Sequence, residues 1–531
     1  MNSRHALSML AALAALTLGF QARAGDASTL TDTIVTQEGP VRGLNAGTLQ
    51  SYLGIPYAAP PVGPLRWRRP QAVQSWSAVL DATKAGAPCA QGDDLGPFAT
   101  AGGREDCLTL NVHVPQRPAS PGRLRPVLVW IHGGSLLVGQ GDHYDPTRLA
   151  NQGDVVVVTL NYRLGLFGFF AHASLLAEDP LAANLGQLDQ LAALDWVQRN
   201  AAAFGGDRQQ VIIAGESSGG GSVLAHVISP LSAGRFQKAI VMSGASLILR
   251  HPTFGAARPL DDALQAGQRF AQAAGCVDQS AQCLRALSTD QVLALQTPYV
   301  THQTIVDGRF MPQHPGVALA SGHFNRVDLV VGTTRDEARF FAGLGEHKTN
   351  QPMSAVQAHQ ALAYLFGPHR IRAVERVYPQ SAYDTPAEAY AAAATDYMFT
   401  CPALKVSRLA SRWTRVHHYE FSDRTAPSYL KPASIALGAA HTLELPYLFD
   451  GFKGGQGGLK PMLNSKQVAL SDTMIQAWSA VDTTRAALDW PAFTGRMGEV
   501  LRFQLPLPVR VPATRLHQAH QCAFWDQSGV Y

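Results

Sequence analysis

The sequence contains few charged residues and no excess of either sign. Of 531 residues, 15% are charged and 46% are hydrophobic, which indicates a globular protein with a large core rather than a disordered chain. Lys and Arg number 43 and Asp and Glu 39, so the formal net charge is only +4. This balance provides no basic surface for nucleic acid, and we expect no nucleic-acid partner.

Long hydrophobic runs are lacking after the first segment. Residues 6–20 form an apolar run of about 15 residues, whereas a membrane-spanning helix needs about 20. The run follows Arg4 and is followed by Ala22-Arg23-Ala24, a pattern that signal peptidases cleave. We predict a signal peptide over residues 1–24 and an exported protein, secreted or periplasmic; an N-terminal membrane anchor is the alternative. No linker or repeat divides residues 25–531, which indicates one domain.

Metal and nucleotide motifs are also lacking. The sequence has no C-x-x-C, no Cys/His metal spacing, no H-E-x-x-H, no P-loop and no G-x-G-x-x-G, so we expect no metal and no organic cofactor. Its even number of cysteines in an exported chain favours disulfides over buried free thiols, with every pairing still open. They are Cys89, Cys107, Cys276, Cys283, Cys401 and Cys522.

Short β-branched runs alternate with helical patterns through the middle of the chain. Such alternation predicts an α/β protein with a mostly parallel sheet covered by helices. The expected strands cover residues 127–131, 155–160, 211–213, 239–242 and 327–331, and a helix is expected over residues 185–200.

The motif Gly215-Glu216-Ser217-Ser218-Gly219 lies between an expected strand and an expected helix. Glycines two residues before and after the serine permit a sharp turn that exposes its hydroxyl, so Ser217 is a candidate nucleophile. A second small-residue motif, at residues 130–135, directly follows another strand. Its backbone N–H groups, with that of Ser218, can form an oxyanion hole for acyl transfer. For the motif around Ser217, an ordinary glycine-rich turn is the alternative.

These motifs and several others resemble the type-B carboxylesterases, which include cholinesterases and many bacterial esterases. The resemblance implies an α/β-hydrolase fold and hydrolysis of carboxylic esters by a Ser-Glu-His triad. Its elements are residues 54–58 (Gly-Ile-Pro-Tyr-Ala), 60–63 (Pro-Pro-Val-Gly), 105–112 (Glu-Asp-Cys-Leu-Thr-Leu-Asn-Val), 161–165 (Asn-Tyr-Arg-Leu-Gly) and 204–207 (Phe-Gly-Gly-Asp).

The resemblance assigns the acid and the base of the triad. Glu337 matches the acid position, although Ala338 replaces the usual glycine, and Asp336 is the alternative acid. His441 lies in residues 438–447, which look like the family's histidine loop except that Thr442 replaces a glycine.

The resemblance also assigns supporting groups. Alignment with the family's Gly-Gly-Gly implies oxyanion donors at the N–H groups of Gly134, Ser135 and Ser218, with Ser135 in place of a glycine. It implies the ion pairs Arg66 with Glu105 and Arg163 with Asp189, and the disulfides Cys89–Cys107, Cys276–Cys283 and Cys401–Cys522. Two other histidines, His417 and His418, lie in a strand-like run and are expected to be structural.

The segment between Cys89 and Cys107 bears on the substrate. In cholinesterases the corresponding loop carries a tryptophan that holds a quaternary ammonium, but here its one aromatic residue is Phe98. We therefore expect uncharged esters as substrates, choline esters to be poor, and Leu136 and Leu137 to contact the ester. An amidase or an esterase for aromatic or natural-product esters is the alternative enzyme, and a non-catalytic adhesion ectodomain is the alternative outside enzymes.

Overall fold

The computed structural model describes residues 29–93, 95, 101–119, 122–250, 255–297, 299, 304–367, 369–454, 460–482 and 488–531. The predicted signal peptide and Phe98 lie outside these residues. Within the described ranges, none of the helices is long and apolar enough to cross a membrane.

A twelve-stranded sheet forms the centre of the molecule, in the order β1-β4-β5-β7-β9-β8-β10-β11-β14-β15-β16-β17. Neighbouring strands from β9 to β16 are parallel, and the strands at both edges are antiparallel. The parallel strands are β9 (Val156–Leu160), β8 (Arg125–Ile131), β10 (Gly206–Glu216), β11 (Lys238–Met242), β14 (Asp328–Thr334), β15 (Val416–Phe421) and β16 (Glu499–Phe503). The edge strands are β1 (Thr29–Leu30), β4 (Leu44–Ala46), β5 (Leu49–Pro56), β7 (Thr109–Pro115) and β17 (Val509–Pro512).

The predicted α/β-hydrolase fold, with a large and mostly parallel sheet flanked by helices, is confirmed. Each of the five strands expected from the sequence lies within or overlaps a parallel strand, and all residues of β9 and β11 are buried because helices cover both faces. Two smaller sheets lie apart from the large one. They are β2 (Ile34–Val35), β3 (Pro40–Arg42) and β6 (Leu80–Asp81), and β12 (Arg258–Pro259) with β13 (Ile305–Val306).

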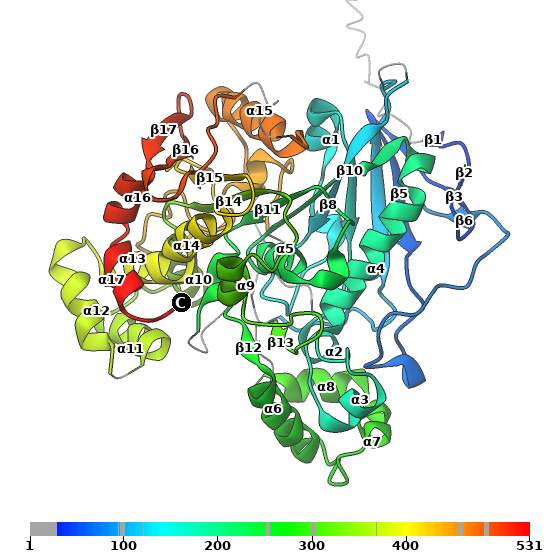
Figure 1. Cartoon of the computed structure of the whole chain (residues 1–531), viewed down its shortest axis with the longest axis horizontal. Coiled ribbons are helices and arrows are strands. Elements are labelled where there is room, and N and C mark those ends of the chain that lie inside the picture. The colour runs from blue at the N-terminus through cyan, green and yellow to red at the C-terminus, as the bar shows by residue number, and fades with distance from the viewer. Residues whose placement is uncertain are drawn as a thin grey trace, which may run out of the picture.

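Helices cover the sheet and form two projecting groups (Figure 1). The expected helix over residues 185–200 is α4 (Leu185–Asn200), and α5 (Ser218–Ile228) packs against β10 and β11. The lower group contains α3 (Ala173–Glu178), α6 (Leu260–Ala273), α7 (Ala281–Ala286) and α8 (Thr289–Gln296), and the group at the left contains α11 (Ala355–Phe366), α12 (Ile371–Val377) and α13 (Pro386–Thr395). The others are α1 (Thr147–Gly153), α2 (Gly165–Gly168), α9 (Pro315–Ser321), α10 (Arg339–Thr349), α14 (Cys401–Ala410), α15 (Ser465–Ser479), α16 (Ala513–Ala519) and α17 (Cys522–Gln527).

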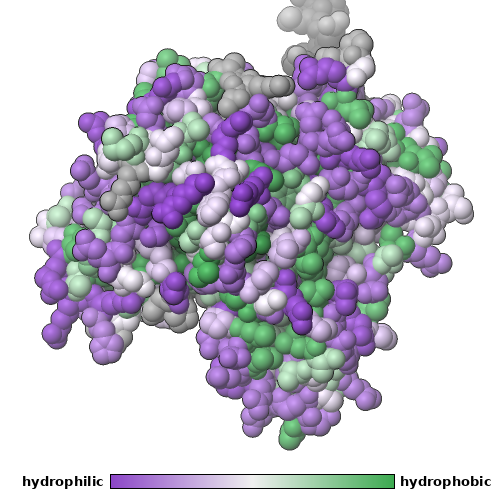
Figure 2. Space-filling view, in the orientation of Figure 1, coloured by the Kyte–Doolittle hydropathy of each residue, from purple (hydrophilic) through white to green (hydrophobic). Residues whose placement is uncertain are grey.

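The covalent and ionic links expected from the sequence are present. The disulfides join Cys89 to Cys107, Cys276 to Cys283 and Cys401 to Cys522. Both ion pairs are also formed, Arg66 with Glu105 and the fully buried pair of Arg163 with Asp189. Figure 2 shows a mostly hydrophilic face, with apolar residues gathered where the lower helical group meets the body. The long disulfide closes a separation of 121 residues and ties α17 to α14.

Candidate active site

Ser217 lies at a sharp turn between β10 and α5. Its backbone has φ 57° and ψ −125°, a conformation that non-glycine residues rarely adopt, and its N–H donates to the carbonyl of Met242 at 2.9 Å. A Cβ on Gly215 would lie 2.6 Å from the Ile131 carbonyl oxygen, and one on Gly219 would lie 2.1 Å from it. Both glycines are therefore required where the turn passes the end of β8.

The predicted oxyanion residues form a second turn immediately after β8. Gly134 has φ +105°, and a Cβ there would lie 2.1 Å from the carbonyl oxygen of Val138. Ser135 adopts φ 61° despite its side chain. The N–H of Leu136 donates to Ser218 Oγ at 3.1 Å, which links this turn to the start of α5. Because Ser218 begins α5, its own N–H has no acceptor within the helix.

Glu337 and His441 are in direct contact. Glu337 Oε2 lies 2.6 Å from His441 Nδ1, and its Oε1 accepts from Ser243 Oγ at 2.6 Å and from the Thr334 N–H at 2.8 Å. The carboxyl group is fully buried, and every one of these contacts fixes its orientation. Because Glu337 occupies Nδ1, Nε2 is the ring nitrogen that can exchange a proton with another group.

The alternative acid, Asp336, points to a different group. Its Oδ2 accepts from the Ala439 N–H at 3.0 Å and from Arg424 Nε at 3.1 Å. Asp336 therefore supports the histidine loop through its backbone, whereas Glu337 contacts the imidazole.

The other nitrogen of His441 faces Glu216. Glu216 Oε1 lies 3.2 Å from His441 Nε2, and both side chains are almost completely buried. Burial raises the pKa of Glu216 well above its usual range, and the nearby carboxyls of Glu444 and Glu337 raise it further. The rings of Phe340, Phe341 and Phe399 also surround the imidazole.

Two cavities meet at Ser217, and Ser135 also lines both. The cavity on the imidazole side is lined by Glu216, Phe340, Phe341, His441, Thr442 and Phe452, among others. The opposite cavity is lined by Leu136, Ser218, Ser243, Ser246, Leu247 and Phe399, among others. Of the two leucines expected at the substrate, Leu136 lines this second cavity, and Leu137 is buried with its N–H bonded to the Gly134 carbonyl.

Three contributors were not identified from the sequence alone. Glu216 is the variable residue of the elbow motif, and an ionisable residue beside the nucleophile was the available signal. Ser243 orients Glu337 from beyond β11, and Glu444 is a second buried carboxyl group with a pKa raised by burial and by Glu337. Within the described ranges, no group of three or more His, Cys, Asp or Glu side chains is arranged to hold a metal ion.

The two histidines expected to be structural are buried on β15. His418 Nδ1 lies 2.8 Å from Ser407 Oγ, and the ring of His417 packs on the edge of Trp490. Burial lowers the pKa of His417 to about 4 and that of His418 to about 3. Neither ring is in the cavities at Ser217.

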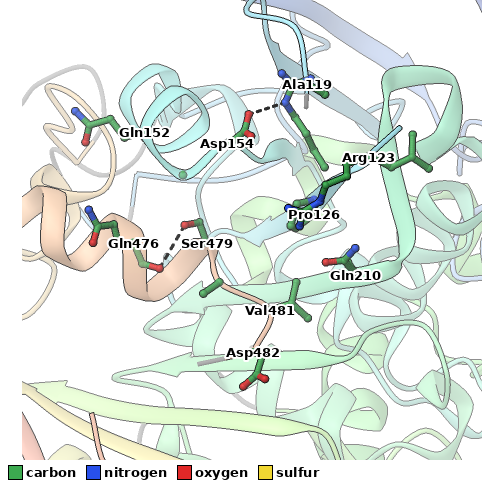
Figure 3. A pocket seen from close by; sticks show the side chains of 14 residues that line it. Ala119, Arg123, Pro126, Gln152, Asp154, Gln210, Gln476, Ser479, Val481 and Asp482 are labelled. Atoms are coloured by element: carbon green, nitrogen blue, oxygen red, sulfur yellow. Dashed lines mark hydrogen bonds and ion pairs between the residues drawn. The ribbon is translucent and has the colours of Figure 1, made fainter. Parts of the chain in front are cut away.

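A wider groove of about 730 Å³ lies near the amino end of β8, away from Ser217 (Figure 3). It is lined by Arg125 at the start of β8, whereas the oxyanion turn follows the end of that strand. The seven residues of β8 separate the groove from that turn by about 20 Å. Arg125 Nε donates to Asp154 at 2.8 Å. The groove shares no residue with the cavities at Ser217.

The fold and the site define an α/β-hydrolase with a serine at the nucleophile elbow, and the comparisons agree. The profile of the Carboxylesterase family matches residues 31–525. The chain is 34% identical to the para-nitrobenzyl esterase of Bacillus subtilis over 489 residues, covering 88% of this chain and 94% of that protein. It is also 34% identical to the cocaine esterase of Homo sapiens over 519 residues, covering 92% and 88%.

Solved structures give the same answer. A thermophilic PNB esterase superposes with a TM-score of 0.77 at 31% identity, covering 92% of this chain and 99% of that one. The chain therefore belongs to the carboxylesterase family. It is a carboxylic-ester hydrolase.

Proposed function

We propose that this protein hydrolyses uncharged carboxylic esters with Ser217 as nucleophile, His441 as general base and Glu337 as the acid that orients the imidazole. The observation that carries the proposal is the 2.6 Å contact of Glu337 with His441, which lines a cavity that Ser217 also lines. Gly134, Ser135 and Ser218 are the proposed oxyanion donors.

In the first half of the reaction, Ser217 Oγ attacks the ester carbonyl carbon while His441 Nε2 takes the hydroxyl proton. The carbonyl oxygen becomes an oxyanion, which the three N–H groups and the positive end of α5 stabilise. Collapse of the tetrahedral species breaks the bond to the alcohol oxygen. His441 returns the proton to that oxygen, and Ser217 retains the acyl group.

In the second half, water attacks the acyl-serine carbonyl. His441 takes one water proton and then delivers it to Ser217 Oγ, which leaves as the carboxylic acid forms. Glu337 stabilises the imidazolium in both halves, because its carboxylate accepts from Nδ1 throughout.

Two features support uncharged substrates. Burial and the carboxyl groups of Glu444 and Glu337 raise the pKa of Glu216, which disfavours a negative charge beside the imidazole that could hold a cationic alcohol. The neighbouring walls are formed by Phe340, Phe341 and Phe452, which favour apolar groups.

The decisive experiment replaces the nucleophile. Ser217→Ala removes one oxygen that faces the cavities, so the fold is retained, and kcat/KM for a chromogenic ester should fall by about 10⁴-fold or more. Circular dichroism and thermal melting verify the fold. Hydrolysis near the wild-type rate by Ser217→Ala would overturn the proposed nucleophile. Comparing butyrylcholine with an isosteric neutral butyrate ester tests the substrate class, and a clear preference for the cation would overturn it.

We also propose export through cleavage after residue 24. The three disulfides support an oxidising compartment. N-terminal sequencing of the protein recovered outside the cytoplasm should begin near Gly25. A chain that keeps residues 1–24 and remains in the cytoplasm would contradict this.

A further inference from the structure

The residue after the base has a backbone conformation that its side chain disfavours. Thr442 has φ +70°, in the left-handed region, where a β-branched residue is a conformational outlier. Glycine adopts this region without cost. Outliers of this kind persist where surrounding contacts hold them, and they concentrate at functional sites.

Two hydrogen bonds hold the Thr442 side chain in place. Its Oγ1 donates to the carbonyl of His441 at 2.5 Å and also contacts the hydroxyl of Tyr429. A threonine hydroxyl has one proton, and that proton is used on the carbonyl, so Tyr429 is the donor to Thr442. Tyr429 is buried, and burial raises its pKa well above the usual range, so its hydroxyl keeps the proton at any working pH.

The same side chain forms part of the wall on the imidazole side of Ser217. Thr442 lines that cavity together with His441 and Phe452, and Phe452 packs edge-on against the Tyr429 ring with centroids 6.0 Å apart. The leaving alcohol must lie on this side, because its oxygen receives the proton from His441 Nε2. The opposite cavity is left for the acyl group.

We propose that Thr442, held by Tyr429, is a specificity-determining residue that limits the size of the alcohol part of the ester. The methyl and hydroxyl groups of Thr442 occupy space beside the imidazole that a glycine would leave open. This inference rests on the proposed function, since the division into alcohol and acyl sides follows from Ser217 and His441.

The test compares two substrate series. In one, acetate esters carry alcohols from methanol to a bulky branched or benzylic alcohol; in the other, methyl esters carry acyl chains of increasing length. We define the alcohol ratio as kcat/KM for the acetate of the bulkiest alcohol divided by kcat/KM for methyl acetate. Thr442→Gly should raise this ratio by about tenfold or more. Its acyl-chain preference should stay within about twofold of the wild type.

Matched variants separate the wall from a general loosening of the site. Leu247→Ala, on the opposite cavity, should change the acyl preference and leave the alcohol ratio within about twofold. Tyr429→Phe keeps the ring but removes the donor, and it should shift the alcohol ratio in the same direction as Thr442→Gly by a smaller factor. Thr442→Ser retains the hydroxyl and should lie between the wild type and Thr442→Gly, which preserves the test if the glycine variant does not fold.

An alcohol ratio unchanged in both Thr442→Gly and Thr442→Ser, with hydrolysis still dependent on Ser217, would overturn this inference alone. Equal shifts in both substrate series would also overturn it, because they would indicate a merely structural role. Hydrolysis that does not depend on Ser217 would overturn the proposed function together with the inference.

Discussion

His441 and His520 are both buried, and each lies between two carboxyl groups. For His441 the distances are 2.6 Å from Nδ1 to Glu337 and 3.2 Å from Nε2 to Glu216. For His520 they are 2.6 Å from Nδ1 to Asp396 and 3.3 Å from Nε2 to Glu420. Similar contacts thus occur in two places, near the carboxyl ends of the central strands and beside the long disulfide.

The second carboxyl group distinguishes the two sites. Glu420 also accepts hydrogen bonds from Arg502 Nε at 2.5 Å and from Ser422 Oγ at 2.6 Å. Burial alone would raise the pKa of Glu420, but these groups and His520 lower it to about 2. Burial would lower the pKa of His520, but Asp396 and Glu420 raise it to about 10. His520 is therefore held as a cation.

At the other site the pKa of the second carboxyl group is shifted in the opposite direction. Burial and two further carboxyl groups, those of Glu444 and Glu337, raise the pKa of Glu216, so the charged form of Glu216 is disfavoured. An imidazole that must gain and lose a proton needs one charged partner, whereas an imidazole that stabilises the fold gains from two.

The largest expected effect separates the two histidines by activity. His441→Gln should lower kcat/KM by about 10⁴-fold or more, because no group remains to accept the Ser217 proton, while the melting temperature changes little. His520→Gln should leave kcat/KM of the folded enzyme within about tenfold of the wild type. Steady-state assays with thermal melts provide both numbers, and the opposite pattern would exchange the two roles.

The two consecutive acids should also separate. Glu337→Gln replaces the charged partner of His441 and should lower kcat/KM by about 10⁴-fold. Asp336→Asn retains an oxygen for the Ala439 N–H and should cost less than about tenfold. Kinetics on the same chromogenic ester provide the comparison, and a larger loss in Asp336→Asn would reassign the acid.

Removing the cation at the second site should reduce stability. His520→Gln leaves Asp396 and Glu420 buried without their shared partner, a loss of about 3 to 5 kcal/mol in the free energy of unfolding. His517→Gln is the matched control, because His517 is 28% exposed and pairs with Asp526 at the surface. That control should cost less than about 1 kcal/mol. Urea unfolding with intact disulfides measures both, and equal losses would refute a special role for His520.

The stability difference between wild type and His520→Gln should depend on pH. The pKa of His520 is raised from 6.5 to about 10, so its contribution is complete below pH 6.5 and is lost as pH rises through 10. The pKa of Glu420 is lowered from 4.5 to about 2, so its contribution is present above pH 4.5 and is lost as pH falls through 2. The loss of stability in His520→Gln should therefore be greatest between pH 4.5 and pH 6.5. A loss that does not depend on pH would contradict the paired charges.

The smallest effect is expected at Glu216. Because its raised pKa disfavours the charged form of Glu216, Glu216→Gln should change little charge, and kcat/KM should fall by less than about tenfold. Glu420→Gln removes a carboxylate that three groups share and should lower the free energy of unfolding by about 3 kcal/mol or more. A severe catalytic loss in Glu216→Gln would show that Glu216 acts as a charged group.

Much of the fold followed from local patterns. The β-branched runs mark strands such as β9 and β11 because both faces of a central parallel strand are buried. The antiparallel strands β1, β4 and β17 were not predicted, since short strands whose residues are mostly exposed or only partly buried have no continuous apolar run. The Ser217 turn was recognisable because its requirement, glycine at two fixed positions, is written in consecutive residues.

The amino-acid sequence by itself determined the elbow, the oxyanion turn, the cysteines and the membership of a hydrolase family, because each depends on residues close together in the chain. Tertiary structure decided which of two adjacent acids meets His441, since the direction of a side chain depends on groups such as Thr334, Ser243 and Ala439. It also decided that the pKa of Glu216 is raised and that of Glu420 is lowered. Two glutamates have the same chemistry in a sequence, and the burial, hydrogen bonds and nearby charges that folding gives each of them set the direction of its pKa shift.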